Sequence, residues 1–156
     1  MAPTKTAKSG KPGRRNGFDA YQLARTGAEV SGAVDAQSLS RVMDRLQPGS
    51  APIRWRISGT HDASGRPAIV VDLHGQVRLE CQRCLGEVEW PVDQTTLLLL
   101  ARDERELAAL DADSENEVVL AKAALDPLTL VEDELTLSLP FAPRHEEGGC
   151  ALPRTR

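Results

Sequence analysis

The sequence predicts an α+β domain: an antiparallel sheet, either a meander or an open, barrel-like sheet, with a short helix in the N-terminal half and a packed C-terminal helix. Apolar and polar residues alternate with a period of two in several stretches between residues 53 and 101, as in strands with one buried face. Residues 38–46 and 126–139 instead repeat their apolar residues at helical spacing. A chain of 156 residues that is 40% apolar suffices for one domain but is short for two.

The strands are expected mainly in the middle of the chain. Residues 61–67 contain the aspartate, serine, glycine and proline that are typical of a turn. Trp55 and Trp90 are expected to be the large apolar anchors of the meander. We expect strands over residues 28–34, 53–58, 68–73 and 76–81, over 88–93 and 95–101 as one long or two consecutive strands, and over 117–120.

Two shorter helices are expected before the C-terminal one. The first, over residues 38–46, ends at a Gln-Pro-Gly sequence, and a second, over residues 103–113, is expected on the surface. The first helix is expected to pack against the core through Leu39, Val42, Met43 and Leu46.

The C-terminal helix has the clearest start, because Asp126 is a suitable N-cap and Pro127 fits the first helical position. Pro140 ends it. Its buried face is expected to hold Leu128, Val131, Leu135 and Leu139. Its solvated side is expected to hold Glu132, Asp133 and Glu134.

Charge is unevenly distributed along the chain. The net charge of −4 would ordinarily argue against a nucleic-acid-binding protein. However, the first 25 residues hold six basic residues and one acidic residue, so the remainder holds 13 basic and 22 acidic residues, a net charge of −9. We expect residues 1–17 to form a disordered basic tail, either an RNA or ribosome contact or a solubilising extension. Its basic residues are Lys5, Lys8, Lys11, Arg14 and Arg15.

Several classes of protein are disfavoured by features that the sequence lacks. The longest uninterrupted apolar runs, residues 68–71 and 97–101, are far shorter than the roughly 18–20 residues of a membrane-spanning helix. No secretory signal is visible, and three cysteines are too few for a disulfide scaffold. We therefore expect a soluble protein of the reducing cytoplasm, with no membrane partner.

Cys81 and Cys84 are separated by two residues, a spacing at which two thiolates can bind one metal ion or close a redox disulfide. Their flanks predict strand, turn, strand, which is typical of a zinc knuckle, whereas a thioredoxin-like site precedes a helix. His145 and Cys150 offer a second ligand pair, and all four would form a closed, structural zinc site. Two alternatives stay open, a cysteine pair without metal and redox chemistry.

No catalytic constellation can be assembled from the sequence. It contains no paired-carboxylate motif, phosphate-binding glycine loop or nucleophile elbow. The two other histidines, His61 and His74, are expected in exposed turns rather than as ligands. We therefore expect a protein that is not an enzyme and has no small-molecule substrate.

Two motifs follow each other along the chain: residues 77–85, VRLECQRCL, and residues 130–145, LVEDELTLSLPFAPRH, with a trailing cysteine at Cys150. In this order they resemble the bacterial YceD family, the large ribosomal RNA subunit accumulation proteins. The resemblance covers roughly residues 18–150, which we take as the domain, with 151–156 as a C-terminal tail. Family members often continue into an acidic stretch and a closing Asn-Pro-Phe segment, which this sequence lacks.

The resemblance implies a ribosome-biogenesis factor, because family members are implicated in the synthesis, processing or stability of 23S ribosomal RNA. It places the family's cysteine pair on Cys81 and Cys84 and its trailing cysteine on Cys150. The family's acidic helix segment and its Pro-x-x-Pro-x-His step fall on Glu132, Asp133, Glu134, Pro140, Pro143 and His145.

Because the chain after residue 25 is acidic, we consider three ways in which the protein could associate with large-subunit ribosomal RNA. These are the basic tail, a protein partner from ribosome assembly, and a local basic face. That face would consist of Arg54, Arg56, Arg78 and Arg83. An aromatic content of 3% disfavours a base-stacking platform. A thiol redox or metal-sensing protein and an acidic protein–protein adaptor are the alternative functions.

Overall fold

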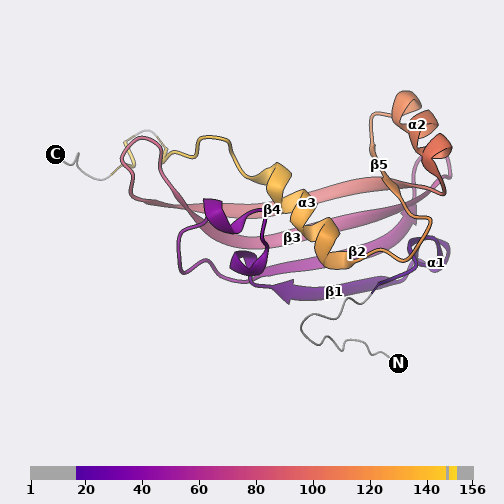
Figure 1. Ribbon diagram of the computed structural model, residues 1–156, viewed down its shortest axis with the longest axis horizontal. Helices are drawn as coiled ribbons and strands as arrows, with labels where there is room; N and C mark the ends of the chain where they lie inside the picture. The colour runs from indigo at the N-terminus through magenta and orange to yellow at the C-terminus, as the bar shows by residue number, and fades with distance from the viewer. Residues whose placement is uncertain (1–16, 147, 151–156) are drawn as a thin grey trace.

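The fold is one five-stranded sheet with its strands in chain order (Figure 1). The computed structural model describes residues 17–146 and 148–150, so most of the predicted tails, 1–16 and 151–156, lie outside the described residues. Neighbouring strands from β1 to β4 are antiparallel, and β5 pairs parallel with β4. The expected α+β class with an open antiparallel sheet is therefore confirmed. The strands are β1 (Glu29–Val34), β2 (Ile53–His61), β3 (Pro67–Glu80), β4 (Glu87–Ala101) and β5 (Glu117–Leu120).

Strands β3 and β4 form a long hairpin that dominates the sheet. They contain 14 and 15 residues, so the segments expected over 68–73 and 76–81 are one strand, as are 88–93 and 95–101. His74 consequently lies within β3 and not in a turn, although it is exposed as expected. Beyond His74, β3 pairs with β4 but no longer with β2. The outer part of the hairpin therefore extends past the rest of the sheet.

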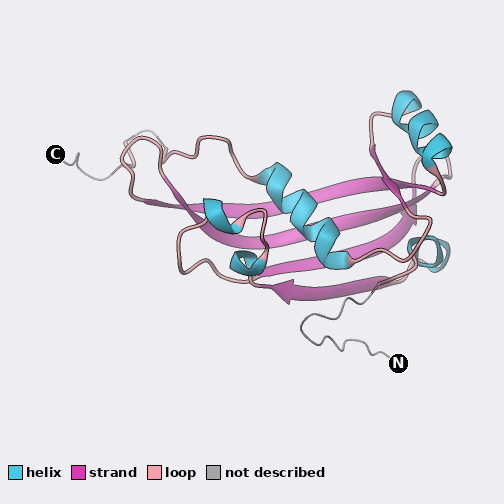
Figure 2. Ribbon diagram, viewed as in Figure 1, coloured by secondary structure: helices cyan, strands magenta, loops and turns pink. Residues whose placement is uncertain are grey.

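One face of the sheet carries the core. Ile53 and Ile57 of β2 and Ile69, Val71 and Leu73 of β3 alternate along their strands and are almost completely buried. The helices α1 and α3 contribute buried residues to the same core cluster (Figure 2). The opposite face is polar along much of its length, because residues such as Arg56, Asp72 and Thr95 occupy the alternate positions. The sheet is thus largely covered on one side.

The helix α1 (Ala20–Thr26) was not among the predicted elements. Its end signals are nevertheless present in the sequence, because the Asp19 side chain accepts a hydrogen bond from the Gln22 N–H and Gly27 ends the helix with φ 71°. A Cβ on Gly59 of β2 would lie 1.8 Å from the carbonyl oxygen of Leu23. Only glycine at position 59 lets α1 approach the sheet this closely.

The helix predicted over residues 38–46 is wrong in type. The segment forms two separate 3-10 turns, η2 (Ala36–Ser38) and η3 (Met43–Arg45). Leu39, Val42 and Leu46 are buried as expected, whereas Met43 is 47% exposed. An α-helix would place Met43 on the face of Leu39, but the break between the two turns rotates it outward.

The helix α2 (Glu104–Asp113) confirms the predicted surface helix, and none of its residues is buried. Asp103 caps it by accepting a hydrogen bond from the Glu106 N–H at 2.9 Å. It connects β4 to β5, and a parallel pair needs such a crossover. Among the residues that the structure describes, no helix is long and apolar enough to cross a membrane.

The helix α3 (Pro127–Ser138) starts as predicted, with Asp126 accepting a hydrogen bond from the Leu128 N–H at 3.0 Å. Two predictions about its faces are wrong. Leu128 is 38% exposed and Leu130 takes its place in the core. Glu134 is 3% exposed and therefore not solvated; the Gln94 amide donates a hydrogen bond to its carboxyl at 3.1 Å. The buried face of α3 is wider than predicted, and it can include Glu134 because Gln94 of the sheet donates a hydrogen bond to the carboxyl.

The burial of Glu134 makes stability depend on pH. Burial raises the pKa of Glu134, the hydrogen bond from Thr96 lowers it, and nearby Glu117 raises it, with a net increase. Its contribution to stability is therefore present below the unfolded-state pKa and is lost as pH rises through the folded-state pKa. We expect Glu134→Gln, measured by urea unfolding, to gain stability relative to the wild type between pH 4 and pH 8. Glu115→Gln, at an exposed position, controls for the lost charge, and an equal trend in both variants would contradict the prediction.

Candidate metal centre

The outer tip of the β3–β4 hairpin positions two of the candidate ligands. Cys81 directly follows β3, and a turn over residues 81–86 leads into β4. The Leu85 N–H donates to the Cys81 carbonyl and the Cys81 N–H to the Gly86 carbonyl, both at 2.8 Å. Leu85 closes this turn in the left-handed region, with φ 63°, which is uncommon for a residue with a side chain. The turn thereby folds the Cys84 side chain back toward Cys81.

The other two candidate ligands arrive on the segment that follows α3. This segment runs from the end of α3 to the hairpin tip (Figure 1). The Gln82 N–H donates a hydrogen bond to the Pro143 carbonyl at 2.8 Å, which fixes the segment beside the tip. A turn follows, with Gly148 at φ 81° and the Gly149 N–H donating to the Glu146 carbonyl at 2.7 Å. His145 and Cys150 are thereby presented to the cysteine pair.

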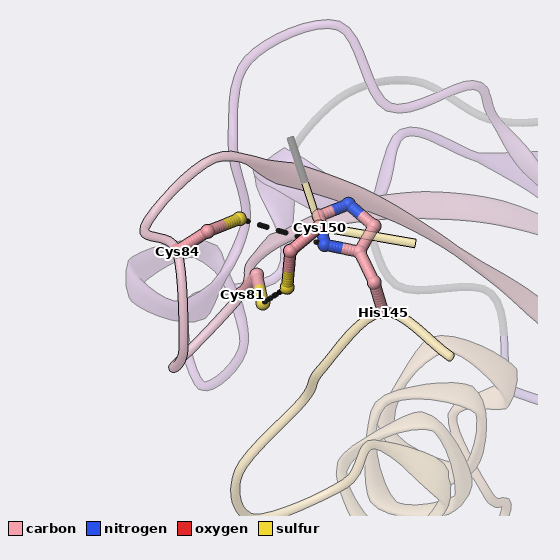
Figure 3. Close-up of side chains that lie close together, drawn as sticks. All are labelled: Cys81, Cys84, His145 and Cys150. Carbon is pink, nitrogen blue, oxygen red and sulfur yellow. Dashed lines mark hydrogen bonds between the residues drawn. The ribbon is translucent and has the colours of Figure 1, made fainter. Parts of the chain in front are cut away.

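The four predicted residues lie together (Figure 3). One donor atom from each of Cys81, Cys84, His145 and Cys150 lies within 4.8 Å of the others. The Sγ atoms of Cys81 and Cys150 are 3.7 Å apart, and Cys84 Sγ is 3.6 Å from His145 Nδ1. Cys81 is fully buried, and the others are partly buried. This group is close enough to bind one metal ion.

The orientation of His145 is set by the backbone of β4. Its Nε2 atom is 2.8 Å from the carbonyl oxygen of Glu87. Because a carbonyl can only accept, Nε2 carries the proton and donates it, which leaves the lone pair of Nδ1 directed at Cys84. Metal-ligating histidines ordinarily use one nitrogen for the ion and the other for such a partner. No sequence signal could have identified Glu87, because every residue offers a carbonyl.

Hydrogen bonding separates the acidities of the Cys81 and Cys150 sulfurs. Burial by itself raises the pKa of Cys81, but N–H groups of Cys84, His145 and Arg83 and the Cys150 thiol donate to its sulfur and lower the pKa to about 5. For Cys150, burial and the neighbouring sulfurs of Cys81 and Cys84 raise the pKa to about 11. At neutral pH Cys81 is thus a thiolate, and a metal ion would displace the proton of Cys150.

Of the predicted nucleic-acid contacts, Arg54, Arg56 and Arg78 lie on the same polar face of the sheet, since Arg54 and Arg56 lie opposite His74 and Asp72 of β3 and Arg78 follows at an alternate position. Lys5, Lys8, Lys11, Arg14 and Arg15 lie outside the described residues. Arg56 pairs with Asp72 at 3.5 Å, and Arg78 pairs with Glu87 at 3.4 Å. Within residues 17–146 and 148–150, Arg54 and Arg83 are exposed and form no ion pair. The polar face of the sheet is therefore largely charge-compensated.

Removing the imidazole should weaken metal binding at this site. We expect His145→Ala to lower the affinity for Co²⁺ by about 100-fold or more, because one of four donors and its carbonyl-fixed orientation are lost. The measurement is a titration that follows visible cobalt–thiolate absorption. His74→Ala is the matched control, since His74 is exposed, lies within β3 seven residues before Cys81, and is not one of the four donors. Equal affinities for His145→Ala and the wild type would show that His145 is not a ligand.

The comparison with known families covers the region that builds this centre. The sequence profile of the family described as Large ribosomal RNA subunit accumulation protein YceD matches residues 69–155, more than half of the chain. The match extends from β3 past Cys150 and includes all four candidate ligands. No solved structure matches the fold. On this match, the chain belongs to the YceD family.

Proposed function

We propose that the protein is a non-enzymatic factor of large-subunit assembly that supports the synthesis, processing or stability of 23S ribosomal RNA. The observation that carries the proposal is the family match, whose description names the accumulation of large-subunit ribosomal RNA. Its partners in this proposal are that RNA or ribosome-assembly proteins in the cytoplasm. Arg56 and Arg78 of the predicted basic face are already paired with acidic residues, so a direct RNA contact would use the tail, Arg54 and Arg83, or a bound partner.

The ion that fits the metal centre best is Zn²⁺. In a tetrahedral site with Zn–S bonds of about 2.3 Å and a Zn–N bond of about 2.0–2.1 Å, two sulfurs lie about 3.8 Å apart and sulfur and nitrogen about 3.6 Å apart. The distances of 3.7 Å between the Cys81 and Cys150 sulfurs and 3.6 Å between Cys84 Sγ and His145 Nδ1 agree with this geometry. Three thiolates and one imidazole are also a donor set that zinc prefers.

A zinc ion at this centre would be structural. Four protein ligands complete a tetrahedron and leave no position for water or substrate. The ligands come from the hairpin tip and from the segment after α3, so the ion would crosslink parts of the chain 66 positions apart, Cys84 and Cys150. This arrangement supports a structural rather than a catalytic role for the ion, in line with the proposal that the protein is not an enzyme.

The surroundings of the cysteine pair disfavour the redox alternative. Catalytic Cys-x-x-Cys sites place the first cysteine at a helix N-terminus, whose dipole stabilises the thiolate. Here the turn after Cys81 leads into β4, a strand. The pKa of Cys81 is lowered by hydrogen bonds that suit a metal-bound thiolate equally well.

Loss of one ligand should cost folding free energy only while zinc is bound. We expect Cys81→Ser to lower the unfolding free energy by about 3 kcal/mol or more in the presence of Zn²⁺, because metal binding is then part of folding. In excess chelator the wild type should lose most of this advantage, so the same two proteins measured with EDTA form the control. A cost that does not change on chelation would instead show that the site is empty.

The proposed role in ribosome assembly is tested by depleting the protein and measuring precursor and mature 23S ribosomal RNA. We expect mature 23S RNA to fall relative to 16S RNA, and the tagged protein to sediment with precursor large subunits. The His74→Ala gene should rescue the depletion, whereas Cys81→Ser should rescue poorly. Unchanged 23S levels together with no co-sedimentation would refute the proposal.

A further inference from the structure

A hollow in the protein surface lies between α3 and β5, away from the metal centre. Its volume is about 280 Å³, and its lining includes Leu98, Leu130 and Leu137. Leu98 and Leu130 are nearly buried, whereas Leu137 on α3 is 67% exposed. In Figure 1, α3 crosses the front of the sheet and β5 lies at the sheet's edge. The hollow therefore has an apolar floor and lies beside the edge strand of the sheet.

The wall formed by β5 is an unpaired strand edge. β5 is the last strand of the sheet and pairs only with β4, through residues 98–101. Within the described ranges, no backbone hydrogen bond joins the outer side of β5 to another segment. A strand edge with free N–H and C=O groups is a template for another extended segment.

The polar part of the lining is acidic. Glu117 on β5 and Asp133 and Glu134 on α3 line the hollow, and Arg41 is its only basic lining residue. The Arg41 guanidinium is already occupied, since it binds the Asp133 carboxylate and lies 3.7 Å from Glu132. Glu117 forms no ion pair among the described residues, so the lining keeps one uncompensated carboxylate, and its wall already accepts one guanidinium.

We propose that this hollow docks a basic, extended segment of a partner protein, which adds to the outer edge of β5. One lysine or arginine of the segment would lie against Glu117 and Asp133, and an apolar residue would pack on Leu130 and Leu137. RNA phosphates would be repelled by this lining. A second copy of the chain would place the acidic linings of two hollows against each other.

This inference goes beyond the proposed function and does not rest on it. The hollow shares no residue with the four candidate metal ligands, and its test uses neither ribosomal RNA nor zinc. A failed docking test would leave the assembly role standing, and a failed depletion experiment would leave the docking site standing.

The test measures binding of a fluorescein-labelled, eight-residue peptide of alternating valine and lysine to the full chain by anisotropy. We expect Glu117→Lys to weaken binding about tenfold or more, because it reverses the charge of an exposed residue of the lining. The matched control is Glu115→Lys, the same change at an exposed residue outside the lining, which should alter the affinity by less than about twofold. Amide exchange within β5 should slow when the peptide binds.

A second pair of variants tests the apolar part. Leu137→Ser should weaken the peptide about fivefold or more, whereas Leu128→Ser, on the same helix but outside the lining, should not. Equal effects in either matched pair, or a peptide of alternating valine and glutamate that binds as well, would overturn the proposal.

The same assay distinguishes a partner protein from two other occupants of the hollow, the chain's own basic segment and RNA. Replacing Lys5, Lys8, Lys11, Arg14 and Arg15 together by serine should leave the peptide affinity unchanged within about twofold. A tenfold gain in affinity would assign the hollow to the chain's own basic segment and overturn the assignment to a partner. Direct binding of a fluorescein-labelled 12-nucleotide single-stranded RNA to the chain, weakened by Leu137→Ser but not by Leu128→Ser, would overturn it in favour of RNA.

Discussion

The length of the β3–β4 hairpin is the constraint on which the rest of the structure depends. Its inner part pairs with β2, whereas beyond His74 β3 has only β4 as a strand partner among the described residues, although Val77, Leu79 and Val92 there are still buried in the core. A two-stranded ribbon is marginal by itself. Its outer part is supported from two sides: the Gln47 N–H donates to the Arg78 carbonyl at 2.6 Å, and the Gln82 N–H donates to the Pro143 carbonyl at 2.8 Å. The loop before β2 and the segment after α3 thus complete what the sheet leaves unsupported.

The metal centre follows from the same constraint. A tip of six residues, 81–86, has too little apolar surface to bury a core of its own, and Leu85 at its end is 67% exposed. A metal ion bound by the four side chains would replace that missing burial, as in other small metal-stabilised units. The segment after α3 would then have to reach the tip whenever the ion is bound. Formation of the tip and placement of the C-terminal segment would thereby become one folding event.

The sequence predicted the strands and the four donors because both leave local signals: alternation in the strands, and cysteine and histidine at fixed positions. It could not predict features that depend on neighbours distant in the chain. Met43 has the right spacing for a buried face, but helical spacing does not distinguish one α-helix from two 3-10 turns. The charged residues beside Glu134 predict that it is exposed to solvent. Its burial is explained only by Gln94 of β4, which donates a hydrogen bond to its carboxyl. The parallel pairing of β5 and the orientation of His145 by the Glu87 carbonyl also depend on contacts between residues distant in the chain.

The two candidate sites lie toward opposite ends of β4. Glu87, which orients His145, begins the strand, and Leu98, in the floor of the acidic hollow, is eleven residues further along, roughly 35 Å at about 3.3 Å per residue. A rigid hairpin therefore holds them apart at a fixed separation, so one site can be altered without repacking the other. The charges that contribute to the net charge of −4 can be located in the structure. Arg56 and Arg78 are paired with acidic residues on the polar face, whereas Glu117 in the lining of the hollow forms no ion pair among the described residues. Under the proposed function and docking site, this distribution favours recruitment to ribosomal RNA through protein partners over recognition of the RNA by the sheet.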